Sequence, residues 1–553
     1  MKPIFIQHQT RSARYRPLAQ SPLLAKIDDE VVTVASLSET GLGCRITSAR
    51  PPALQGTWLP HLSLVPVESS GELDLGPARV VRVEASGPPE SGEYFIGLEF
   101  EREQPQVIDL LRQQLADEPP GHGLLRKHHE AEGPDSTRQT LDQFVDLPHA
   151  DLFAKCRNFQ TWIEGMRESE LYQRFYRLEV QGPIDHHVRV KDFRGYTKEL
   201  TCFDSNSYLG LHLHPEVIEE VERVTRAVGF GTPSAQMLCG TNEHLVGLEE
   251  DLAAFHHRQA AMVFPSGFSA NIGILRALLR SGDAVFRDQH AHASIHEGCR
   301  KSGAEKSKVF AHNDVAYLDR LLTQADRNES GGKLVVTDGV FSMHGELAPL
   351  LDLAAVCRKH RARLMVDDAH GVGVIGPNGR GIEEHFNAVG VTDVLMGTLS
   401  KTLGALGGYV VGDQELIDYL RWYAPSGLFT TTLPAPICAG VRKALELIVT
   451  EPEHRERLWS NIHRFVPPLA EAGFKMSGIT SPIVTVFVGQ QETLWKVSRD
   501  LYDAGIKAGN VIYPAVPRDG CILRFTMNAR HSDVDIDSAV DTLIVIGKRY
   551  GLI

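Results

Sequence analysis

A lysine between hydroxyl side chains, followed by closely spaced glycines, restricts the fold of this chain most. Residues 393–397 read Asp-Val-Leu-Met-Gly and are expected to end a buried strand, and Lys401 follows within the segment 398–408, Thr-Leu-Ser-Lys-Thr-Leu-Gly-Ala-Leu-Gly-Gly. Glycine lets the backbone turn tightly around such a lysine. A lysine held in this way can form a Schiff base with an aldehyde cofactor, although a Ser-Lys pair in a loop is more commonly solvated.

A second apolar run, residues 364–366, leads into Asp367, Asp368, Ala369 and His370. The pattern predicts a buried strand that opens into a site at its carboxyl end. A pyridoxal ring acts as an electron sink while its pyridine nitrogen is protonated, and a buried carboxylate such as Asp367 maintains that state. His370 could reach the phenolic oxygen of the ring. A metal-binding pair or a solvated carboxylate is the alternative.

Residues 263–271 combine a short apolar segment, a Ser-Gly pair and the start of a predicted helix. Backbone N–H groups at a helix start bind anions such as a cofactor phosphate, although a Ser-Gly turn that only begins a helix is commoner.

Three histidines, His290, His292 and His296, lie close together in the sequence. They could be zinc ligands, but no Cys or Glu nearby completes a ligand set. An imidazole stacked on a pyridoxal ring is the other interpretation, and His292 fits it best.

Together these segments resemble the α-oxoamine synthases, a pyridoxal phosphate family with the aspartate aminotransferase fold. The family includes 8-amino-7-oxononanoate synthase and serine palmitoyltransferase. The resemblance runs from about residue 173 to the C-terminus, and its ordered matches are residues 205–210, 240–244, 292–294, 338–343, 366–371, 379–381, 398–401 and 429–434.

The resemblance implies roles for the candidate residues. Lys401 would carry the cofactor as an internal aldimine, Asp367 would pair with the pyridine nitrogen, His370 would contact the phenolic oxygen and His292 would stack on the ring. The other cofactor residues implied are Ser266, Gly267, Phe268, Asp338, Ser342 and Thr398, with Thr430 or Thr431 supplied by the partner subunit of a homodimer.

Substrate binding is assigned by resemblance to Asn206 and Arg524. A guanidinium binds a carboxylate with two parallel hydrogen bonds, which favours arginine for holding an amino acid. A salt bridge at the end of a strand is the alternative for Arg524.

The implied reaction is a decarboxylating Claisen condensation of alanine, serine or glycine with an acyl thioester of coenzyme A or an acyl carrier protein, giving an α-amino ketone, carbon dioxide and thiol. Lys401 would act as the base. An aminotransferase, or a scaffold or enzyme regulated by cyclic di-GMP, is the alternative.

Three departures from the family pattern concern the substrate. Residues 231–239, Gly-Thr-Pro-Ser-Ala-Gln-Met-Leu-Cys, replace a glycine-rich stretch with an arginine, so Gln236 or Met237 stands where the arginine is expected. Ser207 replaces a common Asp, and Asp338 a common Glu. The chemistry is expected to survive, whereas substrate preference is open.

The N-terminal part resembles a PilZ domain, a small β-barrel that often binds cyclic di-GMP. Strands are expected at 31–34, 78–83 and 94–100. The resemblance implies a cyclic di-GMP site at Arg11, Arg14, Arg16, Ser36, Ser38 and Gly41. The arginine spacing departs from the family and Ser36 replaces an acid or amide, so a module used only for contacts is the alternative.

The predicted architecture is therefore α/β: a fold-type I pyridoxal phosphate transferase preceded by a PilZ-like barrel. The expected divisions are the barrel at 1–117, a linker at 118–140, a bridging helix and the start of a small domain at 141–199, a large cofactor-binding domain at 200–440 and a small α+β domain at 441–553.

The composition limits which kinds of partner and site are expected for this chain. The formal net charge of -13 argues against general nucleic-acid binding, which requires clustered positive charge. We expect a cytoplasmic protein with no signal peptide or transmembrane segment. The 8 cysteines are scattered, so neither disulfides nor a metal is expected.

Overall fold

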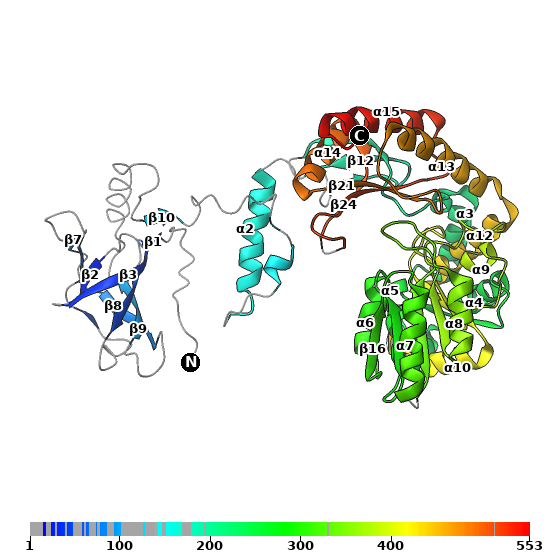
Figure 1. The fold of residues 1–553 in the computed structure, drawn as a ribbon, viewed down its shortest axis with the longest axis horizontal. Helices are drawn as coiled ribbons and strands as arrows, with labels where there is room; N and C mark the ends of the chain where they lie inside the picture. The colour runs from blue at the N-terminus through cyan, green and yellow to red at the C-terminus, as the bar shows by residue number, and fades with distance from the viewer. Residues whose placement is uncertain are drawn as a thin grey trace. The chain divides into compact units, whose positions relative to one another are not determined.

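The computed structural model of the chain divides into two compact units, residues 1–136 and 137–553 (Figure 1). In the first unit, the structure describes the backbone of the strands. In the second it describes residues 139, 141–145, 151–168, 178–192, 195–328, 331–513 and 515–553. Each unit is described by itself.

The described part of the first unit is an antiparallel sheet in the order β5-β8-β9-β4-β3-β2-β6-β7, with β1 paired to β3 and β10. The strands are β1 (Tyr15–Pro17), β2 (Leu24–Ile27), β3 (Glu30–Ser38), β4 (Gly41–Thr47), β5 (Trp58–Leu59), β6 (Leu62–Val65), β7 (Leu73–Asp74), β8 (Ala78–Ala85), β9 (Glu93–Phe100) and β10 (Leu125–Lys127). The three strands expected from the sequence lie within β3, β8 and β9 and are confirmed.

The linker predicted at residues 118–140 includes a described strand. Strand β10 lies inside it and pairs with β1, and the first unit continues to Ser136. A three-residue strand between stretches rich in proline and glycine has too short an apolar pattern to be predicted. Of the proposed nucleotide-binding residues, Arg11 and Arg14 lie outside the described residues.

The second unit begins with a helical segment, a short 3₁₀ turn (Leu141–Phe144) and helix α2 (Ala154–Glu168). Ile163 and Met166 of α2 are buried against Trp495. Within the stretch 141–199, where a bridging helix is predicted, α2 begins at Ala154, and Leu152 and Phe153 before it are exposed.

A seven-stranded sheet forms the centre of the second unit, in the order β14-β20-β19-β18-β17-β15-β16. Its strands are β14 (Ala260–Phe264), β15 (Ala284–Asp288), β16 (Lys306–Phe310), β17 (Lys333–Asp338), β18 (Arg363–Asp367), β19 (Val394–Thr398) and β20 (Gly408–Gly412). Only β20, which begins at Gly408, runs antiparallel to its neighbours in this sheet. Continuous apolar runs form most of these strands because helices cover a parallel sheet on both faces.

The helices and helical turns of this region are α3 (Pro215–Val228), α4 (Glu243–Phe255), α5 (Gly267–Leu278), α6 (Ala293–Lys301), α7 (Val315–Asn328), α8 (Leu350–Lys359), α9 (Ile382–His385), α10 (Gln414–Tyr423), α11 (Pro425–Leu428), α12 (Ala435–Thr450), η3 (Leu211–Leu213) and the π-helical turn η4 (Gln236–Gly240). Parallel strands place their carboxyl ends at one edge, and Asp338 of β17 lies directly beside Asp367 of β18 in the register. That edge is where the predicted site residues gather.

Two smaller sheets complete the unit. One contains β11 (Glu179–Gln181), β12 (His187–Lys191), β13 (Thr197–Cys202) and β22 (Ile506–Lys507), and the other β21 (Ile483–Gly489), β23 (Gly509–Val511) and β24 (Cys521–Thr526). Because β13 pairs in parallel with β22, residues before 200 join the C-terminal segment. Helices α13 (Glu453–Ala472), α14 (Gln491–Asp503) and α15 (Asp533–Tyr550) lie beside these strands (Figure 1).

Across the described residues, we find no helix that combines the length and apolar character needed to cross a bilayer.

Candidate active site

Lys401 lies in the turn after β19 and is partly buried. Burial lowers the pKa of its ammonium group to about 8, and the negative charges of Asp367 and Asp338 limit the fall. Its amine is therefore neutral, and nucleophilic, at a pH far below the usual range for lysine.

Asp367 ends β18 and is held by two hydrogen bonds. The Ala369 N–H donates to Oδ1 over 3.0 Å, and the Asn271 amide donates to Oδ2 over 2.7 Å. The carboxylate is 5% exposed, so these donors replace the water it has lost. Asp367 therefore has one fixed orientation at the edge of the sheet.

A chain of hydrogen bonds connects Asp367 to His292. The Asn271 amide also donates to the Ser294 hydroxyl over 2.9 Å, and that oxygen lies 2.7 Å from Nδ1 of His292 at the start of α6. Burial lowers the pKa of the His292 imidazole, which favours its neutral form. Neither Asn271 nor Ser294 had been given a role from the sequence, although both lie in segments that the motifs had picked out.

Asp338, at the end of β17, contacts the backbone of His292. Its Oδ1 accepts the His292 backbone N–H over 3.1 Å. Burial, reinforced by the charge of Asp367, raises the pKa of Asp338 well above its ordinary value. The Asp338 carboxyl group is therefore suited to carry a proton.

His370 follows Asp367 by three residues and contacts Tyr208. Its Nδ1 lies 2.6 Å from the Tyr208 hydroxyl, and burial holds the pKa of the imidazole well below its ordinary value. Tyr208 is fully buried with a φ of 49°, a conformation rare for a bulky residue. Sequence reasoning gave Tyr208 no role, because only the fold reveals this contact.

The anion site expected at residues 266–268 has the geometry of a helix N-terminus. Ser266 caps α5 and exchanges hydrogen bonds with Ser269 in a capping box, which leaves the N–H groups of Gly267 and Phe268 without an intrahelical acceptor. A Cβ atom on Gly267 would lie 3.1 Å from Oγ1 of Thr398, so Thr398 of β19 borders the same space.

The predicted substrate residues meet at one guanidinium group. Nε of Arg524, on β24, donates to the Ser342 carbonyl over 2.7 Å, and one terminal nitrogen donates to Oδ1 of Asn206 over 3.2 Å. Among the described residues, no carboxylate forms an ion pair with Arg524, so the strand-end salt bridge expected as an alternative is wrong. The charge remains available to an anionic ligand.

The histidines considered as zinc ligands do not converge. His290 stacks on His312 with ring centroids 4.2 Å apart, whereas Nδ1 of His296 accepts a hydrogen bond from Arg287. His292 has the contacts given above. The zinc alternative for these three residues is therefore wrong.

The loop at residues 231–239 has its own partners. The Gln236 amide donates to the Val263 carbonyl over 3.0 Å, next to the start of α5, whereas the Met237 side chain is exposed. Thr431 pairs with Ala235. Within the described residues, neither Thr430 nor Thr431 bonds to the α5 N-terminus or to Thr398.

The residues around Lys401 fit pyridoxal phosphate. The fixed Asp367 carboxylate suits a protonated ring nitrogen, and the first-turn N–H groups of α5 suit a phosphate. The buried Oδ1 of Asn271, beside Asp367, has no hydrogen-bond partner among the described residues, which indicates room for a further polar group.

Comparisons with known proteins agree with this geometry. The chain is 36% identical over 415 residues to 4-hydroxy-2,2'-bipyrrole-5-methanol synthase PigH of Serratia sp. (strain ATCC 39006), covering 75% of this chain and 63% of that protein, so it spans less than two thirds of that relative. It is 37% identical over 392 residues to 8-amino-7-oxononanoate synthase 1 of Bacillus velezensis, covering 71% of this chain and 97% of that protein.

Among solved structures, serine palmitoyltransferase from S. paucimobilis with a bound PLP–myriocin aldimine superposes with a TM-score of 0.69 and 31% identity, over 73% of this chain and 100% of that one. Residues 198–543 match the family described as aminotransferase class I and II. The chain belongs to that family.

Proposed function

We propose that this chain is a pyridoxal phosphate enzyme that condenses an amino acid with an acyl thioester. The amino acid is alanine, serine or glycine, and the acyl group is carried on coenzyme A or an acyl carrier protein. The products are an α-amino ketone, carbon dioxide and free thiol. The observation that carries the proposal is the partly buried Lys401 beside an Asp367 carboxylate that Asn271 holds in place.

The site residues are suited to hold the cofactor. The helix N-terminus at Gly267 and Phe268, with Ser266 and Thr398, would hold the phosphate, and Asp367 would pair with the ring nitrogen. Bound pyridoxal phosphate supplies an electron sink that stabilises a carbanion at the amino acid's α-carbon.

The protein's own groups would then position the substrate and move the proton. Arg524, oriented by Asn206 and the Ser342 carbonyl, would hold the amino-acid carboxylate, the group that leaves as carbon dioxide. With its pKa lowered to about 8, Lys401 would accept the α-proton at Nζ. Neutral His292 and His370 would pack against the cofactor without adding positive charge to the site.

We also propose that the enzyme is a homodimer. Large apolar side chains are exposed on the segments that Ala235 and Thr431 join, with Phe230 87%, Leu238 82% and Phe429 83% exposed. A second copy covering this surface would bring Thr430 or Thr431 to the partner's phosphate site. Sedimentation of the Phe429→Asp variant tests the dimer: we expect a monomer with weakened cofactor binding, and an unchanged dimer would contradict this interface.

Titration of the visible absorbance of the holoenzyme with alanine, serine and glycine in turn tests the function. One of the three should shift the band in the absence of thioester, and addition of an acyl thioester should then release thiol. If a 2-oxo acid, rather than a thioester, completes the turnover, the enzyme is an aminotransferase and the proposal fails.

For the first unit, we propose a PilZ-like module that binds cyclic di-GMP. In the backbone, Tyr15 of β1 pairs with Leu37 of β3, and Ser38 pairs with Gly41 across the β3–β4 turn. Because β1 and β3 are antiparallel, this register places Arg16 beside Ser36 in the sheet. Calorimetry of the full chain with cyclic di-GMP, compared with an Arg16→Ala variant, tests this: no heat of binding would leave a module used only for contacts.

A further inference from the structure

Three potential metal ligands meet at the corner between α12 and α13. Glu451 is the residue directly after α12, His454 lies in the first turn of α13, and His214 caps the start of α3. Their side chains are between 20% and 28% exposed. One carboxylate oxygen, Oε2 of Glu451, lies 2.9 Å from Nε2 of His454 and 3.6 Å from Nε2 of His214.

These separations suit a tetrahedral ion. Zinc binds imidazole nitrogen and carboxylate oxygen at about 2.0–2.2 Å, so two ligand atoms of one tetrahedral zinc lie about 3.4 Å apart. The two distances lie on either side of that value, and the ion would replace the 2.9 Å hydrogen bond between Glu451 and His454. The imidazole rings are 5.9 Å apart between centroids and perpendicular, so both can direct Nε2 toward one point without stacking.

His214 supplies a second, independent observation. Its Nδ1 is buried and has no hydrogen-bond partner among the described residues. Its Nε2 is too far from Glu451 for a hydrogen bond at 3.6 Å. Nε2 is therefore the nitrogen available to an ion at the centre of the cluster, and such an ion would leave Nδ1 as it is.

Acidic residues flank the cluster in the sequence, and the side chain of the arginine between them bonds elsewhere. Glu453 and Glu456 lie in the first turn of α13, and the nearby guanidinium of Arg455 is directed to the carbonyls of Ile448 and Pro377.

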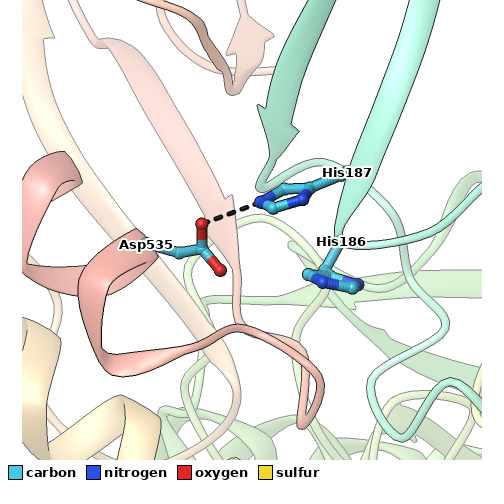
Figure 2. Close-up of side chains that lie close together, drawn as sticks. All are labelled: His186, His187 and Asp535. Atoms are coloured by element: carbon cyan, nitrogen blue, oxygen red, sulfur yellow. Dashed lines mark hydrogen bonds and ion pairs between the residues drawn. The ribbon is translucent and has the colours of Figure 1, made fainter.

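In a second group with metal-ligand chemistry, His186, His187 and Asp535, both oxygens of the carboxylate are already bonded (Figure 2). Figure 2 shows Asp535, at the start of α15, facing His187. Oδ1 of Asp535 lies 2.7 Å from Nε2 of His187. The other oxygen of Asp535 accepts hydrogen bonds from Ser532 in a capping box. Arg530 also lies 3.3 Å from Asp185, next to His186, and its positive charge opposes a metal ion there.

We propose that His214, Glu451 and His454 bind one divalent transition-metal ion, with Zn²⁺ as the ion that this ligand set suits. Two imidazoles and one carboxylate supply three protein ligands, and water would occupy the fourth position. The ion would join the start of α3 to the α12–α13 corner, where the chain passes from the helices of the central sheet to those of the smaller sheets. It would stabilise that corner, independently of the chemistry at Lys401.

Zinc binding to the full-length holoenzyme tests the proposal. The protein is dialysed against a chelator and then titrated with ZnCl₂ in competition with a chromophoric chelator, and bound zinc is counted by elemental analysis. We expect one zinc per chain, and a Co²⁺-substituted sample should show the absorption of a tetrahedral ion.

Single variants locate the site. His214→Asn and His454→Asn should each weaken zinc binding by at least about tenfold, since even groups that only support a ligand contribute that much. His463→Asn, a matched control on α13 whose Nδ1 bonds to the Trp459 carbonyl, should bind zinc normally, as should His187→Asn in the second group.

If a histidine variant fails to fold, as judged by circular dichroism, Glu451→Gln removes the charged ligand while keeping the side-chain volume. Absence of zinc from the wild-type protein would overturn the proposal. Unchanged binding in the His214 and His454 variants, or a loss caused by His187→Asn, would also overturn it. Cofactor absorbance, recorded in each sample, separates this result from any failure of the proposed enzymatic function.

Discussion

The cofactor half and the substrate half of the candidate site are built in different ways. Asp338, Asp367 and Thr398 end neighbouring strands, and Lys401 follows the last of them, so the parallel sheet alone brings these residues together. In the substrate half, Arg524 bonds to Asn206, 318 residues away in the sequence. The first half depends on local patterns at strand ends, whereas the second depends on how the smaller sheets pack beside the central one.

The largest effect should come from the cofactor half. Lys401→Ala removes both the point of cofactor attachment and the proposed base, so kcat should fall by at least about 10⁴-fold. Product formation measured with excess pyridoxal phosphate checks this. Lys496→Ala, which removes an exposed lysine paired with Glu492 on α14, is the control and should leave turnover unchanged. Comparable activity in the two variants would contradict the assignment of Lys401.

The support of Asp367 gives a second test. Asn271→Ala removes a hydrogen bond to a buried carboxylate, a loss of about 1.5–3 kcal/mol, so kcat should fall by about 10–100-fold. Ser294→Ala removes the hydroxyl that links Asn271 to His292 but leaves the bond from Asn271 to Asp367, and it should cost less. Steady-state kinetics of both variants show which one lowers kcat more, and thermal unfolding confirms that both fold. A larger loss in Ser294→Ala would mean that the link to His292 matters more for turnover than the hydrogen bond to Asp367.

The substrate half should respond mainly in KM. Arg524→Lys keeps the charge but loses the two-pronged geometry, and we expect the KM for the amino acid to rise by about 10–100-fold with little change for the thioester. Arg549→Lys, on an exposed residue paired with Asp500, serves as the control. An effect confined to the thioester would assign Arg524 to the other substrate.

The lowered pKa of Lys401 predicts how cofactor loading depends on pH. Only the neutral amine attacks the aldehyde, so the loading rate of the apoenzyme should rise about tenfold per pH unit below 8 and level off above it. Stopped-flow absorbance gives the profile. The charge of Asp367 raises the pKa of Lys401, so Asp367→Asn should move the profile to lower pH. A midpoint near the ordinary lysine value would show that Lys401 is not desolvated.

The smallest effect should come from Tyr208→Phe. This change removes one hydrogen bond to His370, worth about 0.5–1.5 kcal/mol, and should lower kcat by about 2–10-fold. Kinetics of this variant measure how far the orientation of His370 matters, and an unchanged kcat would show that the packing of His370 holds it without Tyr208.

The sequence predicts the strands that end at the site but not the contacts between distant segments. The strands before Asp367 and Lys401 were predictable because buried parallel strands are continuous apolar runs. The hydrogen bonds of Asn271 and Tyr208 were not, because their partners lie 96 and 162 residues away and no local pattern encodes such a distance. The same holds for His214 with Glu451, although the spacing of Glu451 and His454 was a local signal that could have been noticed. β10 was missed because it is only three residues long.

The most direct test of the proposed reaction is the stoichiometry of a single assay. The purified enzyme is supplied with pyridoxal phosphate, an acyl thioester and the amino acid that shifts its spectrum, labelled in the carboxyl carbon, and labelled carbon dioxide and free thiol are both counted. The account predicts equal amounts of the two, and none with Lys401→Ala. Thiol release without carbon dioxide, or conversion of the amino acid to a 2-oxo acid, would contradict it.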